Sequence, residues 1–314
     1  MSLIVEKVNK TFLHVQAVRD LSLQVEEGEI FGFLGPNGAG KTTTIRMILD
    51  ILRPDSGQIS WNGVPVSKVP RRCWGYLPEE RGLYPKMKVE DHLIFLARLY
   101  GFSKEQAQRS LDEWLERLKM EEYRKSLVEE LSKGNQQKIQ VIASLLHDPD
   151  VLVMDEPFSG LDPVNVSILK EAFLELHERG KTIIFSTHQM EQVEELCQNI
   201  VIINQGQAVV EGSVRDVKRS SGRLVIHLAI DGDPEINWLD QMPGVRVTKR
   251  RQDYVEINLT PEISPDYILQ TALKQGGHVT LFELSEPSLN DIFIERIAGE
   301  EAHLAPEAEF AAHR

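Results

Sequence analysis

The sequence predicts an α/β core built around a parallel β-sheet, followed by a smaller α+β domain. Two observations support this prediction. Short apolar runs, typical of buried strands, alternate with segments of helical periodicity in the first part of the chain, as in sheets whose strands are joined by crossover helices. The pattern changes near residue 220, where Ser220-Ser221-Gly222 has the composition of a linker.

The core elements are expected in a definite order. Residues 4–8 and 21–25 alternate apolar and polar side chains, which is typical of strands in an antiparallel β subdomain with one face in water. Residues 30–34 form a continuous apolar run, which indicates a buried strand that enters a glycine-rich loop. A helix is then expected over residues 43–52, and further core strands over residues 151–154, 182–186 and 200–203.

A helical insertion is expected between the core strands, at about residues 84–146. Three segments in it repeat apolar residues with helical spacing, namely 89–100, 104–118 and 136–146. The core and this insertion are together expected to form one domain of residues 1–219.

The following residues are expected to form a small α+β domain over residues 220–298. Its expected strands span residues 224–230, 245–248, 254–259 and 279–284, and its helices lie around Trp238, from Ser264-Pro265 to Gly276-Gly277, and over residues 288–297. Lys249-Arg250-Arg251, between two strands, is interpreted as a solvated hairpin tip. The Ala- and Glu-rich residues 299–314 have no core pattern, so a disordered tail is expected.

The composition excludes some functions. The 314 residues carry 48 acidic and 35 basic side chains, a net charge of −13, which argues against binding nucleic acid because phosphate backbones need a basic surface. Cys73 and Cys197 lack metal-binding spacing and are interpreted as reduced intracellular thiols. The N-terminus MSLIVEKVNK has no signal core, and no run approaches about 18 apolar residues. Any role at a membrane is therefore expected to depend on a partner.

The glycine-rich loop points to nucleotide chemistry. It reads GPNGAGKT and fits the pattern G-x-x-x-x-G-K-[ST] with Gly35, Pro36, Asn37, Gly38, Ala39, Gly40, Lys41 and Thr42. Its glycines let backbone N–H groups wrap a phosphate, and the helix that begins at Thr43 adds its dipole. Lys41 brings a charge to the β- and γ-phosphates, and Thr42 offers a hydroxyl to Mg²⁺. The loop between a strand and a helix predicts a P-loop NTPase with a RecA-like core.

Two acidic residues and a histidine complete the predicted catalytic site. Asp155 follows the strand at 151–154 and is suited to hold Mg²⁺, while Glu156 can polarise an attacking water as general base. His188 ends another core strand, where it could contact the γ-phosphate or that water. Lys41, Glu156 and His188 are therefore the predicted catalytic residues.

The stretch LSKGNQQK, at residues 131–138, has two interpretations. Ser132 could cap the helix that follows by accepting a backbone N–H bond. The same helix N-terminus could also hold a phosphate through its free N–H groups and its dipole. The stretch alone leaves both interpretations open.

The motifs GPNGAGKT, LSKGNQQ, VLVMDEP, SGLD and STH, in this order, resemble the ATP-binding subunits of ABC transporters over roughly residues 2–215. The ending EPSLNDIFIERI resembles the accessory domain of ATPases in bacterial exporters, including sodium-efflux and drug-export types. The resemblance implies that two ATPase subunits, either two copies of this chain or this chain and a relative, pack head to tail around two ATP molecules. Hydrolysis then drives a separate integral membrane permease, which implies a cytoplasmic protein held at the inner face of the cell membrane.

The resemblance also assigns roles to single residues. Ser132 and Gly134 would contact ATP bound to the second subunit, and Asp162 in SGLD would communicate across the dimer. Phe12 would stack on adenine, unless it is an ordinary core aromatic. Glu79 stands where the family usually carries Gln; its carboxylate could bind Mg²⁺ or water but adds negative charge near the phosphates.

The signature departs from the family in two further places. Asn135 replaces a glutamine, and Lys133 replaces a glycine, where its ammonium either approaches the γ-phosphate or points to solvent.

A soluble ABC-type ATPase in translation or DNA maintenance is disfavoured by the single phosphate loop and the net charge of −13. A P-loop kinase or GTPase is disfavoured by the signature and by the lack of an N-K-x-D motif. The C-terminal domain favours export, and the transported substrate is expected to be recognised by the permease.

Overall fold

The computed structural model describes residues 2–80, 82–220, 222, 224–233, 235–260, 262–275 and 278–296. The chain divides into two compact units, the first ending at Ser213 and the second beginning at Val214. The division lies ahead of the boundary expected at residue 219, because helix α7 (Val214–Ser220) groups with the second unit. Each unit has its own hydrophobic core.

A six-stranded sheet in the order β10-β9-β3-β8-β7-β6 forms the centre of the first unit. Its strands are β3 (Ile30–Leu34), β6 (Trp74–Leu77), β7 (Val151–Asp155), β8 (Thr182–Thr187), β9 (Asn199–Asn204) and β10 (Gln207–Ser213). All neighbours are parallel except β10, which pairs antiparallel with β9. Strands β3, β7 and β8 are buried along their whole length, which explains their continuous apolar sequences. The predicted α/β class is confirmed.

A second, antiparallel sheet lies in the same unit, with the order β2-β1-β4-β5. It comprises β1 (Ser2–Phe12), β2 (Val15–Glu26), β4 (Ser56–Trp61) and β5 (Val64–Pro65). Its inner face shares one core with helix α1 (Lys41–Ile48) and with side chains of the central sheet. Helix α1 ends before the predicted residue 52, because the chain leaves the helix at Leu49 and Asp50 takes a positive φ of 51°.

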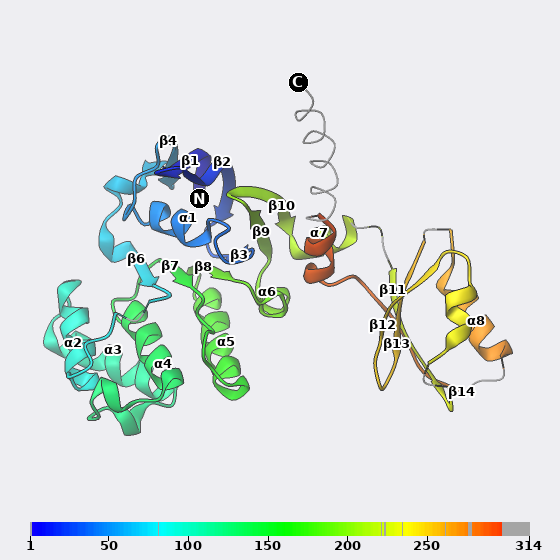
Figure 1. Cartoon of the computed structure of the whole chain (residues 1–314). Coiled ribbons are helices and arrows are strands. Elements are labelled where there is room, and N and C mark those ends of the chain that lie inside the picture. The colour runs from blue at the N-terminus through cyan, green and yellow to red at the C-terminus, as the bar shows by residue number, and fades with distance from the viewer. Residues whose placement is uncertain are drawn as a thin grey trace. The chain divides into compact units, whose positions relative to one another are not determined.

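The helices α2 (Val89–Leu99), α3 (Lys104–Arg117) and α4 (Lys133–Leu145) occupy the chain between β6 and β7. They gather at one end of the first unit, while the antiparallel sheet lies at the other end (Figure 1). Helices α5 (Pro163–Glu178) and α6 (Met190–Leu196) flank β8 in sequence and were not predicted. Among the described residues, no helix combines the length and the apolarity needed to cross a bilayer.

The second unit is an antiparallel sheet in the order β12-β13-β11-β14, with helix α8 beside it (Figure 1). The elements are β11 (Leu224–Asp231), β12 (Val245–Arg250), β13 (Val255–Leu259), α8 (Pro265–Lys274) and β14 (His278–Ser285). Ile268 and Ala272 of α8 pack into the core of the sheet. The helix expected around Trp238 is a short 3₁₀ helix (Asn237–Gln241), and residues 289–296 form the last described helix. The expected tail at 299–314 lies outside the described residues.

The basic triplet in this unit is more engaged than the sequence suggested. Lys249 lies 3.3 Å from Glu256, and Arg250 lies 2.8 Å from Asp240. The Arg251 guanidinium lies 5.9 Å from the centre of the Tyr254 ring. Lys249 and Arg250 are the last two residues of β12, and each pairs with a carboxylate, so the interpretation of the triplet as a solvated hairpin tip is wrong for both. Arg251 follows the strand and contacts the Tyr254 ring.

Candidate functional site

The phosphate loop connects β3 to α1, and its backbone explains its glycines. Gly35 has a φ of 144°, and a Cβ atom added there would lie 2.1 Å from the Ile203 carbonyl oxygen. Gly40 has a φ of 108°, and its Cβ atom would lie 2.4 Å from the Ala17 carbonyl oxygen. Both positions therefore exclude a larger residue through backbone conformation and through direct contact.

Lys41 is buried, with only 7% of its surface exposed. Its Nζ donates to the carbonyl oxygens of Gly35, at 2.6 Å, and of Pro36, at 3.1 Å. Burial lowers the pKa of Lys41, and the nearby carboxylates of Glu156, Asp155 and Glu79 oppose this shift. A triphosphate placed on the loop would add negative charge beside this ammonium, which favours its charged form.

Thr42 and Asp155 meet as the sequence predicted for a metal site. The Thr42 hydroxyl donates to Asp155 Oδ2 at 2.6 Å. Asp155 is 1% exposed, and its other carboxylate oxygen accepts a bond from the Ser186 hydroxyl. A hydroxyl and a carboxylate on adjacent elements are the hard oxygen ligands that suit Mg²⁺, which takes few protein ligands when it binds with a nucleotide. These residues therefore fit the ion.

Glu156 follows β7 with a positive φ of 51° and has 7% of its surface exposed. The Thr187 hydroxyl and the His188 backbone N–H each donate to its carboxylate at 3.1 Å. The ring nitrogen Nδ1 of His188 lies 2.8 Å from the same carboxylate. His188 thus contacts the predicted general base itself, a pairing that the sequence did not indicate.

A cavity of about 360 Å³ unites these groups. Its lining comprises Ala17, Asn37, Gly38, Ala39, Gly40, Lys41, Thr42, Thr43, Glu79, Asp155 and Glu156. Glu79 thus reaches the cavity from the loop that follows β6. Seven predicted residues are not part of this lining, namely Phe12, Gly35, Pro36, Ser132, Gly134, Asp162 and His188.

Phe12 is not a core aromatic, because 44% of its surface is exposed. It ends β1, and Lys10 Nζ lies 5.6 Å from the centre of its ring. Leu13, the next residue, is 97% exposed. An aromatic ring with this much exposed surface is suited to stacking against a flat base.

The N-terminus of α4 is capped by Ser132, whose hydroxyl accepts the Asn135 N–H at 3.2 Å. The capping interpretation of this serine is therefore correct within one chain. A Cβ atom on Gly134 would lie 3.3 Å from the Gly160 carbonyl oxygen, so the glycine also serves close packing. Ser132 and Lys133 are exposed, which leaves this end of the helix accessible.

Asp162 is likewise a helix cap. Its carboxylate accepts the Asn165 backbone N–H at 3.0 Å and the Asn165 side-chain amide at 2.6 Å. These hydrogen bonds lower the pKa of Asp162, which remains ionised at the start of α5.

The polar residues that follow Ser132 form hydrogen bonds to backbone carbonyls of their own chain, which the sequence did not predict. Gln136 donates to the Leu131 carbonyl at 3.2 Å, and Gln137 donates to the Pro157 carbonyl at 3.1 Å. The buried Lys138 donates to the Leu118 carbonyl at 3.2 Å. Glutamine and lysine side chains spaced along one apolar helix were the available signal. Ser186 and Thr187 were also missed, although both hydroxyls stand in the STH motif.

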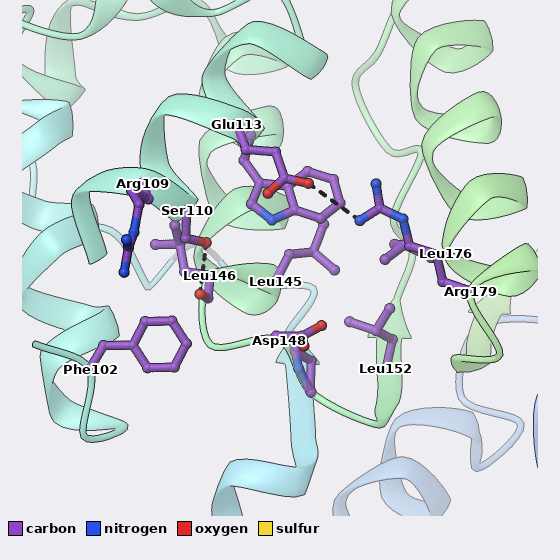
Figure 2. A pocket seen from close by; sticks show the side chains of 12 residues that line it. Phe102, Arg109, Ser110, Glu113, Leu145, Leu146, Asp148, Leu152, Leu176 and Arg179 are labelled. Atoms are coloured by element: carbon purple, nitrogen blue, oxygen red, sulfur yellow. Dashed lines mark hydrogen bonds and ion pairs between the residues drawn. The ribbon is translucent and has the colours of Figure 1, made fainter. Parts of the chain in front are cut away.

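A second cavity, of about 260 Å³, lies between α3, the end of α4 and α5 (Figure 2). Arg179 Nη1 on the α5 side lies 3.3 Å from Glu113 of α3, and the Ser110 hydroxyl donates to the Leu146 carbonyl at 2.8 Å. This cavity shares no lining residue with the one at the phosphate loop.

The site defines a nucleotide-binding ATPase, and comparison with known proteins specifies its family. Residues 18–159 match the ABC transporter family, and residues 212–297 match the C-terminal domain of DrrA1-3-like ATP-binding proteins. An uncharacterized ABC transporter ATP-binding protein of Bacillus subtilis, YhaQ, is 49% identical over 94% of this chain and 98% of its own length. The chain therefore belongs to the family of ABC transporter ATP-binding subunits, whose members generally hydrolyse ATP.

Two further likenesses agree with this assignment. The Nod factor export ATP-binding protein I of Rhizobium etli is 34% identical over 94% of this chain and 92% of its own length. A solved structure of an ATP-binding subunit of an ABC transporter aligns with a TM-score of 0.66 at 33% identity, over 71% of this chain and 94% of that one. The P-loop NTPase fold and the ABC-type family predicted from the motifs are confirmed.

Proposed function

We propose that this chain binds and hydrolyses ATP, with Mg²⁺, to power a separate membrane permease, and that the system is an exporter. The observation that carries the proposal is the single cavity that joins Lys41, the Thr42–Asp155 pair and Glu156. Phosphate binding, metal binding and water activation are the three tasks of ATP hydrolysis, and each has a suitable side chain there.

Each of the catalytic residues has its own task. Lys41 exchanges its bonds to the loop carbonyls for bonds to phosphate oxygens. Glu156 accepts a proton from the attacking water, and Thr187 and His188 hold its carboxylate in place. Mg²⁺, when held by Thr42 and Asp155, supplies positive charge to the phosphate oxygens.

The working unit is proposed to be a dimer of two ATPase subunits, either two copies of this chain or this chain and a relative. Ser132, Gly134 and Asp162 lie outside the chain's own cavity, and Ser132 and Asp162 are exposed. The N-terminus of α4 is therefore available to a phosphate held by the second subunit. Phe12 is proposed to stack on the adenine of the chain's own ATP.

An exposed apolar group on and before α2 supports a permease partner. Tyr84, Phe95 and Leu99 are 53%, 42% and 66% exposed, and the Tyr84 and Phe95 rings lie 6.2 Å apart. A cluster of this kind is suited to receive an apolar segment of another protein. Docking there would hold the chain at the cytoplasmic face of the membrane.

The direction of transport is proposed from the relatives and the second unit. The Rhizobium etli relative is named for export, and the C-terminal match is to the DrrA1-3-like domain. The alternative role in translation or DNA maintenance has no support from the comparisons. The transported substrate is proposed to be recognised by the permease.

Affinity capture of the full chain from detergent-solubilised membranes, in the presence of ATP, tests this proposal. We expect a polytopic membrane protein to be captured, and its amount to fall when Phe95→Asp disrupts the apolar group at α2. Leu273→Asp is a matched control, because Leu273 is a similarly exposed apolar residue in the second unit, with 57% of its surface exposed. Capture of ribosomes or DNA without a membrane protein would contradict the transport function.

A further inference from the structure

Helix α4 carries a buried glutamine that contacts the loop around Glu79. Gln140 is 5% exposed and lies in the middle of the helix. Its Nε2 donates to the carbonyl oxygen of Pro78 at 2.9 Å and to that of Glu80 at 3.0 Å. The two acceptors lie on either side of Glu79, so a single amide group holds the backbone of this loop at two points.

The orientation of the amide follows from its partners. Both acceptors are carbonyl oxygens, which cannot donate, so the NH₂ group must face them. The Oε1 oxygen of Gln140 is buried without a hydrogen-bond partner in the part of the chain that the structure describes. A methionine at this position would keep nearly the same length but remove both bonds, and it would leave the Pro78 and Glu80 carbonyls without this donor.

The loop held by Gln140 brings a charge to the nucleotide cavity. Glu79 lines that cavity together with Lys41, Thr42 and Asp155. Its carboxylate is one of three that interact electrostatically with the Lys41 ammonium in this cavity. Glu79 itself is exposed, and the backbone on both sides of it accepts hydrogen bonds from Gln140.

The same helix also contacts the loop that follows β7. Gln137, one turn before Gln140, donates to the Pro157 carbonyl at 3.1 Å, next to the general base Glu156. Two glutamines on one helix thus hold the two loops that bring Glu79 and Glu156 to the cavity. Helix α4, which follows the exposed Ser132, therefore hydrogen-bonds to two loops that line the nucleotide cavity of its own chain.

We propose that Gln140 is a positioning residue that sets where the Glu79 carboxylate lies in the nucleotide cavity, and that it acts on Mg–ATP binding through Glu79. This inference rests on the proposed ATPase function. It assigns to Gln140 no contact with the nucleotide or with the metal. Residues that orient a metal ligand without contacting the metal typically change the metal affinity by roughly 10–100-fold when they are removed. This range sets the scale of the expected effect.

The test measures binding of a fluorescent ATP analogue to the full-length chain while the Mg²⁺ concentration is varied. In Gln140→Met we expect the Mg²⁺ concentration for half-maximal binding to rise roughly tenfold. Hydrogen exchange at the backbone amides of residues 79 and 80 should become faster, and binding measured without Mg²⁺ should change far less. Ser144→Ala is the matched control, because Ser144 is also buried in α4 but bonds only to Val141 of its own helix.

A double variant separates a positioning role from a general loss of structure. If Gln140 acts through Glu79, Gln140→Met should have no further effect on Mg²⁺ dependence in a Glu79→Ala background. Additive effects of the two substitutions would overturn the proposal, and so would an unshifted Mg²⁺ midpoint in a folded Gln140→Met chain. If the methionine variant does not fold, Gln140→Asn keeps the amide but shortens its reach, and the same shift is expected. A wild-type chain that binds no ATP would contradict the proposed function instead.

Discussion

Ser186→Ala removes the hydroxyl that donates to the Asp155 carboxylate, without touching the phosphate loop. Asp155 is 1% exposed and Ser186 is completely buried, so water cannot easily replace the lost bond. The Thr42 hydroxyl would remain as the donor to the other carboxylate oxygen. The variant therefore isolates the support of one predicted metal ligand.

The magnitude follows from the charge and the burial. A hydrogen bond to a charged group contributes about 1.5–3 kcal/mol to stability. For a domain of this size each 1 kcal/mol shifts the Tm by about 2–4 °C, so the Tm of the first unit should fall by roughly 3–12 °C. Because Ser186 orients a ligating carboxylate from behind, the Mg²⁺ concentration for half-maximal ATP hydrolysis should also rise roughly 10–100-fold.

Differential scanning calorimetry and steady-state hydrolysis over a range of Mg²⁺ concentrations measure the two effects. Ser167→Ala is the control, because Ser167 is an exposed serine whose hydroxyl bonds only to the Pro163 carbonyl of its own helix, at 3.1 Å. A Ser186→Ala chain with the Tm and the Mg²⁺ dependence of this control would refute the reasoning, since the Ser186–Asp155 bond would then contribute nothing measurable.

Three other predictions concern the phosphate loop, a buried histidine and the thiols. Lys41→Ala should weaken ATP binding at least tenfold (about 1.4 kcal/mol) in an equilibrium titration, and unchanged affinity would exclude the assigned role of Lys41. Burial lowers the pKa of His92, so the unfolded chain binds its proton more readily and stability is lost as the pH falls below about 6.5. His92→Leu should therefore lose less stability in urea denaturation between about pH 7 and about pH 5 than wild type, whereas an equal loss in both would argue against this account. Burial also raises the pKa of both thiols, most strongly for Cys197. Alkylation of the native chain, followed by mass spectrometry, should label Cys73 first, and faster labelling of Cys197 would contradict its burial.

The central sheet could be predicted where burial leaves a clear pattern. Strands β3, β7 and β8 are buried on both faces and therefore appear as unbroken apolar runs. Strand β10 is an edge strand with mostly exposed or half-buried residues, and it has no such run. Helix α5 begins with Pro163 after a capping Asp162, so the sequence does carry a helix start signal there, directly after SGL.

The candidate site could likewise be predicted only in part from the sequence. The phosphate loop is local, so its residue types and order identify it, and its place between β3 and α1 follows. The bonds of Ser186 to Asp155, of His188 to Glu156 and of Gln140 to the Glu79 loop join residues far apart in the chain. Such pairs depend on strand order and on helix packing, which the periodicity of a single sequence does not provide.

The ATP-bound state of Glu156→Gln tests the central claim most directly. The amide keeps the size of the side chain but cannot accept a proton from water, so hydrolysis should fall by roughly 10²–10⁴-fold while ATP binding is retained. Size-exclusion chromatography with light scattering, in ATP and Mg²⁺, should then show a stable dimer of ATPase subunits. The Lys41→Ala chain should remain monomeric under the same conditions. Hydrolysis at the wild-type rate, or a Glu156→Gln chain that binds ATP and stays monomeric, would contradict the account.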